Sequence, residues 1–257
     1  MYRTVPIEPS RVRKEWTAFG LALTFMTRIP WRFATEPTAD ALARGNSYFP
    51  WVGLLIGLAS VAFFSLASTV WPVMIGLVLL LLAQWLLTGA LHEDGLADCA
   101  DGLAGGHDRA HRLRIMKDSS VGVYGVLAVM IASALKLSLW FSIEPLWVAL
   151  LVAPAVARFT PLLLMSTLEY VQNQDQSKVH TIAQGLTPQR LAVAASVPLL
   201  AALFTGTLLP TLIATALVVL LWGLLLRKLL GGITGDALGA SVLLTELIWL
   251  LVWLALA

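Results

Sequence analysis

Carboxylates concentrate in one stretch of this sequence. Residues 92–118 contain six of the chain's 15 acidic side chains. They are Glu93, Asp94, Asp98, Asp101, Asp108 and Asp118, accompanied by His92 and His107. Mg²⁺ and Mn²⁺ prefer such hard oxygen ligands and are usually held by a few carboxylates together with the phosphate oxygens of a substrate. The stretch therefore predicts metal-assisted chemistry on a phosphate.

The spacing of the aspartates is typical of one helix face. If the chain is helical over 91–108, then Asp94, Asp98, Asp101 and Asp108 stay within roughly 40° of one line at about 100° per residue. Like charges four residues apart repel each other, and a bound cation would offset that repulsion. We expect Asp94, Asp98 and Asp101 to hold Mg²⁺, with Mn²⁺ as a substitute. A solvated helix face is the alternative, but such faces usually mix charges of both signs.

The residues around this acidic face have two interpretations each. Imidazole is not a favoured ligand of Mg²⁺, so His92 is expected beside the metal and not on it. The basic residues that follow, Arg109 and Lys117 among them, can bind substrate phosphate or lipid headgroups. Asp118 and Ser119 precede the next apolar run, where they can act in catalysis or as the N-cap of a helix.

A second polar element interrupts the apolar C-terminal half. The segment LLGGITGDALGAS contains Thr234, Gly235 and Asp236. Glycines allow a ligand to approach the backbone, and free amides at a helix start can bind phosphate. The alternative is a turn in which Asp236 is an N-cap. We predict that this element faces the acidic loop and binds substrate.

The elements that must position these groups are transmembrane helices. The chain is 58% hydrophobic and only 12% charged, whereas soluble domains carry about 25% charge. We therefore predict an all-α, polytopic membrane bundle of about seven spans that forms a single catalytic domain over 1–257. The expected spans are 48–70, 73–91, 121–141, 145–168, 191–208, 211–226 and 237–257. The basic residues are spread over several loops, so nucleic acid is not an expected partner.

Basic residues in alternate loops predict the orientation. Lys and Arg mark cytoplasmic loops, and the turns near 71–72, 142–144 and 209–210 contain neither. The loops that contain them carry Arg32, Arg44, Arg109, Arg112, Arg114, Lys117, Lys178, Arg190, Arg227 and Lys228. The acidic loop over 92–120 is therefore expected to be cytoplasmic. A full span over 16–31 would reverse this pattern, so we expect a re-entrant or interfacial segment there.

Three ionisable residues fall inside the predicted spans. Arg158 and Glu246 each lie about ten residues from the cytoplasmic end of a span, at depths that allow them to pair. Such a pair serves either function or structure, and Arg158 is a candidate for substrate binding. Lys136 lies near the outer end of its span, where we expect its side chain to reach the interface.

The motifs resemble those of the cobalamin synthase family, the adenosylcobinamide-GDP ribazoletransferases. HEDGLADCADGL, RIMKDSSVGVYG and LGGITGDALGA carry the resemblance, with FMTRIPW and RGNSYFPWVGLLIG before the first span in the same order. The matching positions are His92, Asp94, Asp98, Asp101, Lys117, Asp118, Ser119, Thr234, Gly235 and Asp236. Two positions depart from the expected pattern, since Cys99 replaces a threonine and Ser120 an arginine.

The resemblance implies a multi-pass enzyme of a prokaryotic inner membrane. It would join adenosylcobinamide-GDP to α-ribazole or α-ribazole 5'-phosphate and release GMP. A ribose hydroxyl would attack the phosphorus nearest the aminopropanol, and a base must take its proton. Asp118 is our first candidate for that base and Asp108 the second, and His92 is also assigned to the catalytic group.

Two other functions are weighed against this one. A CDP-alcohol phosphotransferase also uses an aspartate-rich helix, but its motif requires an Ala-Arg pair after the glycine and an aspartate where this chain has Gly122. An ion-coupled transporter usually binds its ions near the middle of the bilayer. Most carboxylates here lie in a loop at the predicted cytoplasmic edge, which favours the enzyme.

Overall fold

The computed structural model describes residues 11–33, 36, 38–171 and 185–256. Lys178, one of the basic residues used to predict orientation, lies outside them. The described residues are mostly helical and contain one isolated β-bridge, between Tyr170 and Ile233. The predicted all-α class is therefore confirmed.

The helices follow the predicted apolar runs closely. They are α1 (Arg11–Met26), α2 (Ala39–Gly45), the 3-10 turn η1 (Asn46–Tyr48), α3 (Phe49–Ala67), α4 (Val73–Thr88), α5 (Leu91–Gly105), α6 (Arg109–Ile115), α7 (Val123–Ser142), α8 (Leu146–Ala157), α9 (Thr160–Thr167), α11 (Pro188–Thr205), α12 (Leu208–Leu217), the π-helical turn η3 (Val218–Trp222), α13 (Gly223–Leu229) and α14 (Gly235–Leu256). Each predicted span coincides with one helix or one broken helix to within a few residues.

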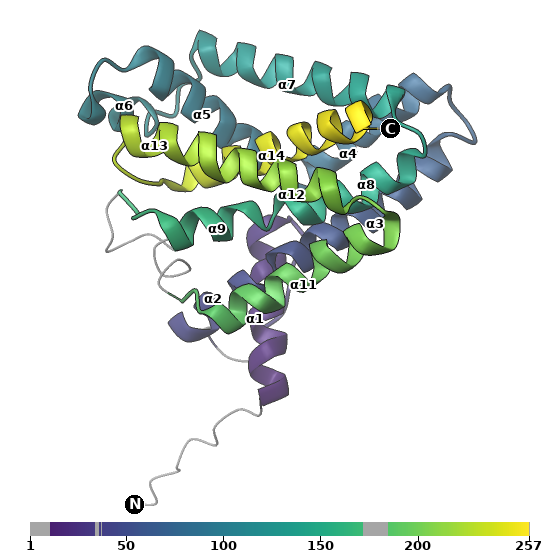
Figure 1. The fold of residues 1–257 in the computed structure, drawn as a ribbon, viewed down its shortest axis with the longest axis horizontal. Helices are drawn as coiled ribbons and strands as arrows, with labels where there is room; N and C mark the ends of the chain where they lie inside the picture. Colours follow the sequence, from purple (N-terminus) through teal and green to yellow (C-terminus); the bar gives the residue numbers. More distant parts are fainter. Residues whose placement is uncertain (1–10, 34–35, 37, 172–184, 257) are drawn as a thin grey trace, which may run out of the picture.

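Six helical stretches of the described chain are long and apolar enough to cross a membrane, and a seventh is bent. The bent one joins α4 to α5 at an angle of 89°. This agrees with the prediction of about seven spans. In Figure 1 the long helices run side by side, and α1 lies across them. That direction fits the expected interfacial placement of the N-terminal segment better than a further span.

The core forms around α8, which packs against α3 and α14. Almost every residue of α8 is buried, so its apolar run faces other helices and not lipid. Gly53 and Gly57 of α3 meet the α8 backbone, which lets these two helices approach closely. α14 contacts α5, α7, α8 and α12, so it is the element that connects the bundle core to the acidic segment.

Buried ionisable residues in the bundle pair differently from the prediction. Glu246 forms a salt bridge of 2.9 Å with Lys136, whose Nζ also donates to Gln84 Oε1 at 3.0 Å. Lys136 is 4% exposed, so the prediction that it extends to the interface is wrong. This pair takes the place of the one between Glu246 and Arg158 that the sequence allowed. Pairing inside the bundle avoids the cost of an isolated charge there, and Lys136 on α7 faces Glu246 directly.

Arg158 is buried just after α8 ends. Its Nη1 donates to the carbonyl oxygen of Pro154 at 3.3 Å, and its Nε has no hydrogen-bond partner among the described residues. Glu246 and Glu93 are near enough to interact electrostatically with the guanidinium. Arg158 therefore belongs to a buried group of balanced charges beneath the acidic segment.

Candidate functional site

The acidic segment is a separate helix and not the end of a span. The chain turns at Gly89 and Ala90, both in the left-handed region with φ of 68° and 54°. Glycine adopts this conformation readily, whereas alanine does so at a cost. The Gly89 amide still bonds to Trp85, so the turn closes α4 as a normal helix end. Of the helix considered over 91–108, the structure forms the part from Leu91 to Gly105 as α5.

Asp108 does not share the face of the other aspartates. α5 ends at Gly105, and Asp108 has extended backbone angles as the N-cap of α6, where its side chain accepts the His111 amide at 2.8 Å. The prediction that four aspartates line one helix face is therefore wrong for Asp108. Its hydrogen bond to that amide, with smaller effects from His107 and other neighbours, lowers the pKa of the Asp108 carboxyl.

α5 crosses α14 at the point where their backbones come closest. A Cβ on Gly95 would lie 2.6 Å from the carbonyl oxygen of Asp236, and one on Gly239 would lie 3.4 Å from that of Leu91. Only a residue without a side chain permits the first approach. The crossing brings the acidic motif and the glycine-rich motif together, as predicted from the sequence.

Asp98 is the carboxylate most affected by this crossing. Partial burial, followed by the negative charges of Asp236, Asp94 and Asp101, raises the pKa of its carboxyl to about 7. Three carboxylates of α5 and one of α14 therefore share a small region. A raised pKa of this origin means that the ionised cluster is unfavourable by itself.

Asp101 also has a structural role that the sequence did not indicate. Its two carboxylate oxygens accept the amides of Gly122 and Gly125 at 2.7 and 2.9 Å. These amides belong to the first turn of α7, where no side chain of the local sequence provides a cap. A carboxylate at a helix N-terminus is favourable because of the unpaired amides and the helix dipole.

Asp118 and Ser119 do not cap α7, because the helix begins at Val123 with Gly122 as its N-cap. That alternative interpretation is wrong. Asp118 instead accepts the amide of Ser120 at 2.9 Å, and this bond lowers the pKa of its carboxyl. Lys117, Asp118 and Ser119 are all exposed in the turn between α6 and α7. A carboxylate with a lowered pKa is a weaker base than an ordinary aspartate.

The glycine-rich turn between α13 and α14 is held by several long-range contacts. Thr234 caps α14 by accepting the Ala237 amide at 3.1 Å, so the N-cap role considered for Asp236 belongs to Thr234. Ile233 exchanges backbone hydrogen bonds with Glu169 and Val171 after α9. The guanidinium of Arg109 lies over Gly231, where a Cβ would be 3.3 Å from its Cζ. A cation of α6 is thus placed beside the turn.

A cavity of about 220 Å³ opens between α5 and α14 next to the carboxylates; we call it the α5–α14 cavity. It is lined by Phe25, Met26, Phe49, Leu91, His92, Asp94, Pro161, Met165, Gly235, Asp236, Leu238, Gly239 and Val242. The polar lining groups come from both motifs, and most of the other walls are apolar. Concave sites with mostly apolar walls and a few convergent polar groups are the usual form of a ligand site.

His92 lies in the wall of this cavity and is 4% exposed. Neither ring nitrogen has a hydrogen-bond partner among the described residues. Burial, then the positive charges of Arg158 and Lys136, lower the pKa of the imidazole well below its usual value. The ring is therefore neutral, with one nitrogen able to donate and the other able to accept.

Residues near the N-terminus complete the site, and the chemistry of the motifs did not identify them. Phe25 and Met26 of α1 and Phe49 of α3 line the cavity. The chain after α1 then packs on the α4–α5 turn, where the Arg28 amide donates to Leu87 at 2.7 Å and its guanidinium lies against Gly89. The sequence signals were the motifs FMTRIPW and RGNSYFPWVGLLIG, which the resemblance highlighted without giving a role.

The carboxylates fit a hard divalent cation. As they stand, no three Asp, Glu, His or Cys side chains in the described ranges converge to hold a metal ion. Mg²⁺ does not require three, because it is often bound by one or two carboxylates with substrate phosphate and water. Asp98 with Asp94 or Asp236 provides such donors. Burial first, and then the neighbouring carboxylates, raise the pKa of Asp98, and a bound cation would offset both effects.

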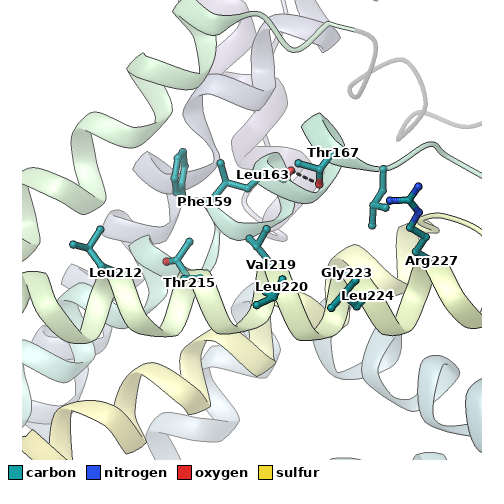
Figure 2. Close-up of a pocket in the computed structure, with 12 residues that line it drawn as sticks. Phe159, Leu163, Thr167, Leu212, Thr215, Val219, Leu220, Gly223, Leu224 and Arg227 are labelled. Atoms are coloured by element: carbon teal, nitrogen blue, oxygen red, sulfur yellow. Dashed lines mark hydrogen bonds between the residues drawn. The ribbon is translucent and has the colours of Figure 1, made fainter.

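A larger cavity than this one lies elsewhere. A groove of about 630 Å³ runs between α9 and the continuous stretch α12–η3–α13. Figure 2 shows its lining of mainly apolar side chains, with Arg227 at one end. No acidic residue is among the described residues that line it, so it lacks the groups needed for metal-assisted phosphate chemistry. The α5–α14 cavity is the better candidate despite its smaller volume.

The fold and this site define a polytopic α-helical membrane protein with a cavity beside the carboxylates where α5 crosses α14. The model of the cobalamin-5-phosphate synthase family matches residues 18–254, and the chain belongs to this family. The chain is 36% identical to an adenosylcobinamide-GDP ribazoletransferase of Shewanella amazonensis over 77% of its length and 78% of the relative. A relative of the same name from Shewanella woodyi is 35% identical over 76% of this chain and 78% of the relative. A third, from another Shewanella, is 38% identical over 74% of this chain and 75% of the relative. No solved structure matches the chain.

The family predicted from the motifs is thereby confirmed, and the CDP-alcohol phosphotransferase alternative is not supported. The transporter alternative is not supported either, because the matching family is described as a synthase. The assignments of individual site residues remain predictions.

Proposed function

We propose that this protein joins adenosylcobinamide-GDP to α-ribazole or α-ribazole 5'-phosphate and releases GMP. The observation that supports this most directly is the α5–α14 crossing, where Gly95 lets the acidic helix meet Asp236 of the glycine-rich turn. The two most specific motifs of the family form one site there. The alternation of basic loops supports a multi-pass protein of the bacterial inner membrane with this site on the cytoplasmic side.

The reaction transfers a phosphoryl group between two oxygens. A ribose hydroxyl oxygen of the acceptor bonds to the phosphorus nearest the aminopropanol, and the bond from that phosphorus to the bridging oxygen breaks. GMP departs with the bonding electron pair, and the hydroxyl proton passes to a base. Such a reaction depends mainly on positioning and on charge neutralisation.

Different residues of the site are proposed to bind the metal, bind phosphate and hold the helices in place. Asp98, with Asp94 or Asp236, would hold Mg²⁺, or Mn²⁺ in its place, which supplies positive charge for the diphosphate oxygens. Asp101 is assigned to fixing α7 against α5, because its oxygens already accept two amides. Arg109 and the backbone of Gly235 are placed to bind phosphate, with Lys117 and Ser119 in the adjacent exposed turn. Thr234 keeps the turn in shape by capping α14.

The proton acceptor is proposed to be Asp118, or Asp108 if Asp118 is dispensable. Both carboxyls have lowered pKa values because each accepts a backbone amide, so neither is a strong base. Arg158 is buried beneath the cavity and is proposed to balance Glu93 and Glu246 in place of contacting substrate.

The decisive experiment is GMP release by the purified full-length protein from adenosylcobinamide-GDP and α-ribazole 5'-phosphate, with Mg²⁺ and with a chelator. We expect release only when both substrates and the metal are present. Unchanged release in the chelator would remove the metal from the proposal. Absence of release under all conditions, from protein that remains folded, would contradict the function itself. Replacement of Asp118 and Asp108 by Asn, one at a time, identifies the base by the larger fall in kcat.

A further inference from the structure

The α5–α14 cavity is too small for a whole substrate of the proposed reaction. Its volume is about 220 Å³. Pockets for complete drug-sized ligands measure about 300–1,000 Å³. The cavity is below that range and is better matched to one bicyclic aromatic ring than to a corrinoid. The cavity therefore has the size of a subsite for one part of a ligand.

The walls of the cavity suit a flat aromatic group. Phe25 and Phe49 contribute rings that stack at 5.7 Å between centroids and 8° between planes. Met26 and Met165 add thioether side chains from α1 and α9, and sulfur packs favourably against aromatic rings. Aromatic rings prefer offset or edge contacts with other rings. These walls would bury a planar heterocycle and would give little to a sugar or a phosphate.

His92 provides the polar group that such a heterocycle needs. Its side chain is 4% exposed and lines the cavity, and neither ring nitrogen has a hydrogen-bond partner among the described residues. Buried polar groups in folded proteins are nearly always hydrogen-bonded. The unpaired imidazole in this wall is therefore available to a polar group that enters the cavity. The other polar lining groups belong to Asp94, Gly235 and Asp236. The cavity thus combines apolar and aromatic walls with acidic groups of α5 and α14.

We propose that the α5–α14 cavity binds the planar aromatic base of the acceptor nucleoside, with an N–H of His92 donating to the unsubstituted ring nitrogen of that base. This inference rests on the proposed function, because it takes the acceptor to be an α-ribazole. It places the attached ribose toward Asp94 and Asp236, where a hydroxyl meets the metal-binding carboxylates. His92 is then a substrate-binding residue, and the base is recognised by fit and by one hydrogen bond.

The test measures binding of α-ribazole to the full-length protein in lipid nanodiscs by calorimetry, without metal and without adenosylcobinamide-GDP. Val242→Phe fills the apolar end of the cavity, and we expect it to weaken binding at least tenfold. Val126→Phe makes the same change at an exposed position of α7 and should leave the affinity within twofold. Equal affinities in the two variants would overturn the proposal.

A second pair of variants addresses the hydrogen bond. His92→Leu removes the donor and should weaken binding about tenfold, whereas His92→Gln keeps an N–H donor and should recover part of that loss. A purely structural histidine would be expected to favour Leu over Gln at a buried position. If Leu binds α-ribazole as well as Gln does, the proposed hydrogen bond is wrong.

Met165→Ala covers the case in which Val242→Phe does not fold, since it enlarges the same cavity instead of filling it. It should change the ratio of affinities for the α-ribosides of dimethylbenzimidazole and of unsubstituted benzimidazole by at least threefold, in favour of the larger base. An unchanged ratio would overturn the proposal. Binding that responds to these variants without any GMP release would contradict the proposed function alone. If the protein releases GMP but none of the variants changes the affinity for α-ribazole, only this inference is contradicted.

Discussion

At the α5–α14 crossing, Asp98 lies near three other carboxylates, whereas inside the bundle Glu246 lies 2.9 Å from Lys136. The first region gathers charges of one sign. The second pairs opposite charges where water is excluded. Two opposite charges neutralise each other without any ligand, whereas a group of like charges stays repulsive until a cation binds. The difference separates a site that needs a bound partner from a contact that stabilises the fold.

The sharpest way to test this comparison is to remove the central carboxylate. We expect Asp98→Ala to lower GMP release by at least about 10³-fold, because the metal and the diphosphate lose a charged ligand. The variant should remain folded, since removing one of several repelling charges does not destabilise the protein. Glu144→Ala changes an exposed carboxylate at the other end of α7 and should alter neither activity nor stability. Full activity of Asp98→Ala would end the catalytic assignment of this cluster.

Breaking the buried pair of Lys136 and Glu246 should lower the stability of the fold, in contrast to the loss of activity expected for Asp98→Ala. Lys136→Met leaves Glu246 buried without its partner and should lower the free energy of unfolding by about 3–5 kcal/mol. The double variant Lys136→Met, Glu246→Leu should recover most of that loss, because it leaves no unpaired charge. Thermal unfolding in nanodiscs measures both. A neutral Lys136→Met would mean that Arg158 can replace Lys136, as the sequence alone had suggested.

The close approach of α5 and α14 provides a test of the geometry between the two regions. Gly95→Ala inserts a methyl group against the carbonyl of Asp236 and should lower kcat/KM for GMP release about 10- to 100-fold, corresponding to about 1–3 kcal/mol of overpacking. Gly105→Ala adds the same methyl group to the same helix, meets only an ordinary contact with Ile115 and serves as the matched control. Equal effects of the two would show that the helix spacing does not position the site.

The smallest effect is expected for the capping of α7. Asp101→Ala removes the acceptor of two amides and should lower the free energy of unfolding by about 1–2 kcal/mol. Asp118→Ala, which the sequence made the local capping candidate, should change it by less than about 0.5 kcal/mol because its side chain is exposed. Chemical unfolding of both variants in matched detergent would decide between them. The reverse order would restore Asp118 as the cap of α7.

The spans, the acidic segment and the family could all be predicted from local pattern. A run of about 20 apolar residues has one stable arrangement in a bilayer, and the repeat of Asp94, Asp98 and Asp101 places them on one face of any helix. The meeting of the acidic and glycine-rich motifs was also predicted, because both lie in loops on the same side of the membrane. These conclusions need only the order of residues along the chain.

The partners of individual charges depend instead on contacts between distant segments. The positions along the sequence suggested Arg158 as the partner of Glu246, and only the packing of α7 against α14 selects Lys136. The cap of α7 comes from Asp101, 21 residues before Gly122, and not from the neighbouring Asp118. The bend at Ala90 requires a left-handed alanine that no sequence pattern indicates. The sequence by itself determined which elements form and which chemistry they carry, since both depend on local composition. Tertiary structure alone decided which side chains meet, because their energies depend on distances that the chain sets only when it folds.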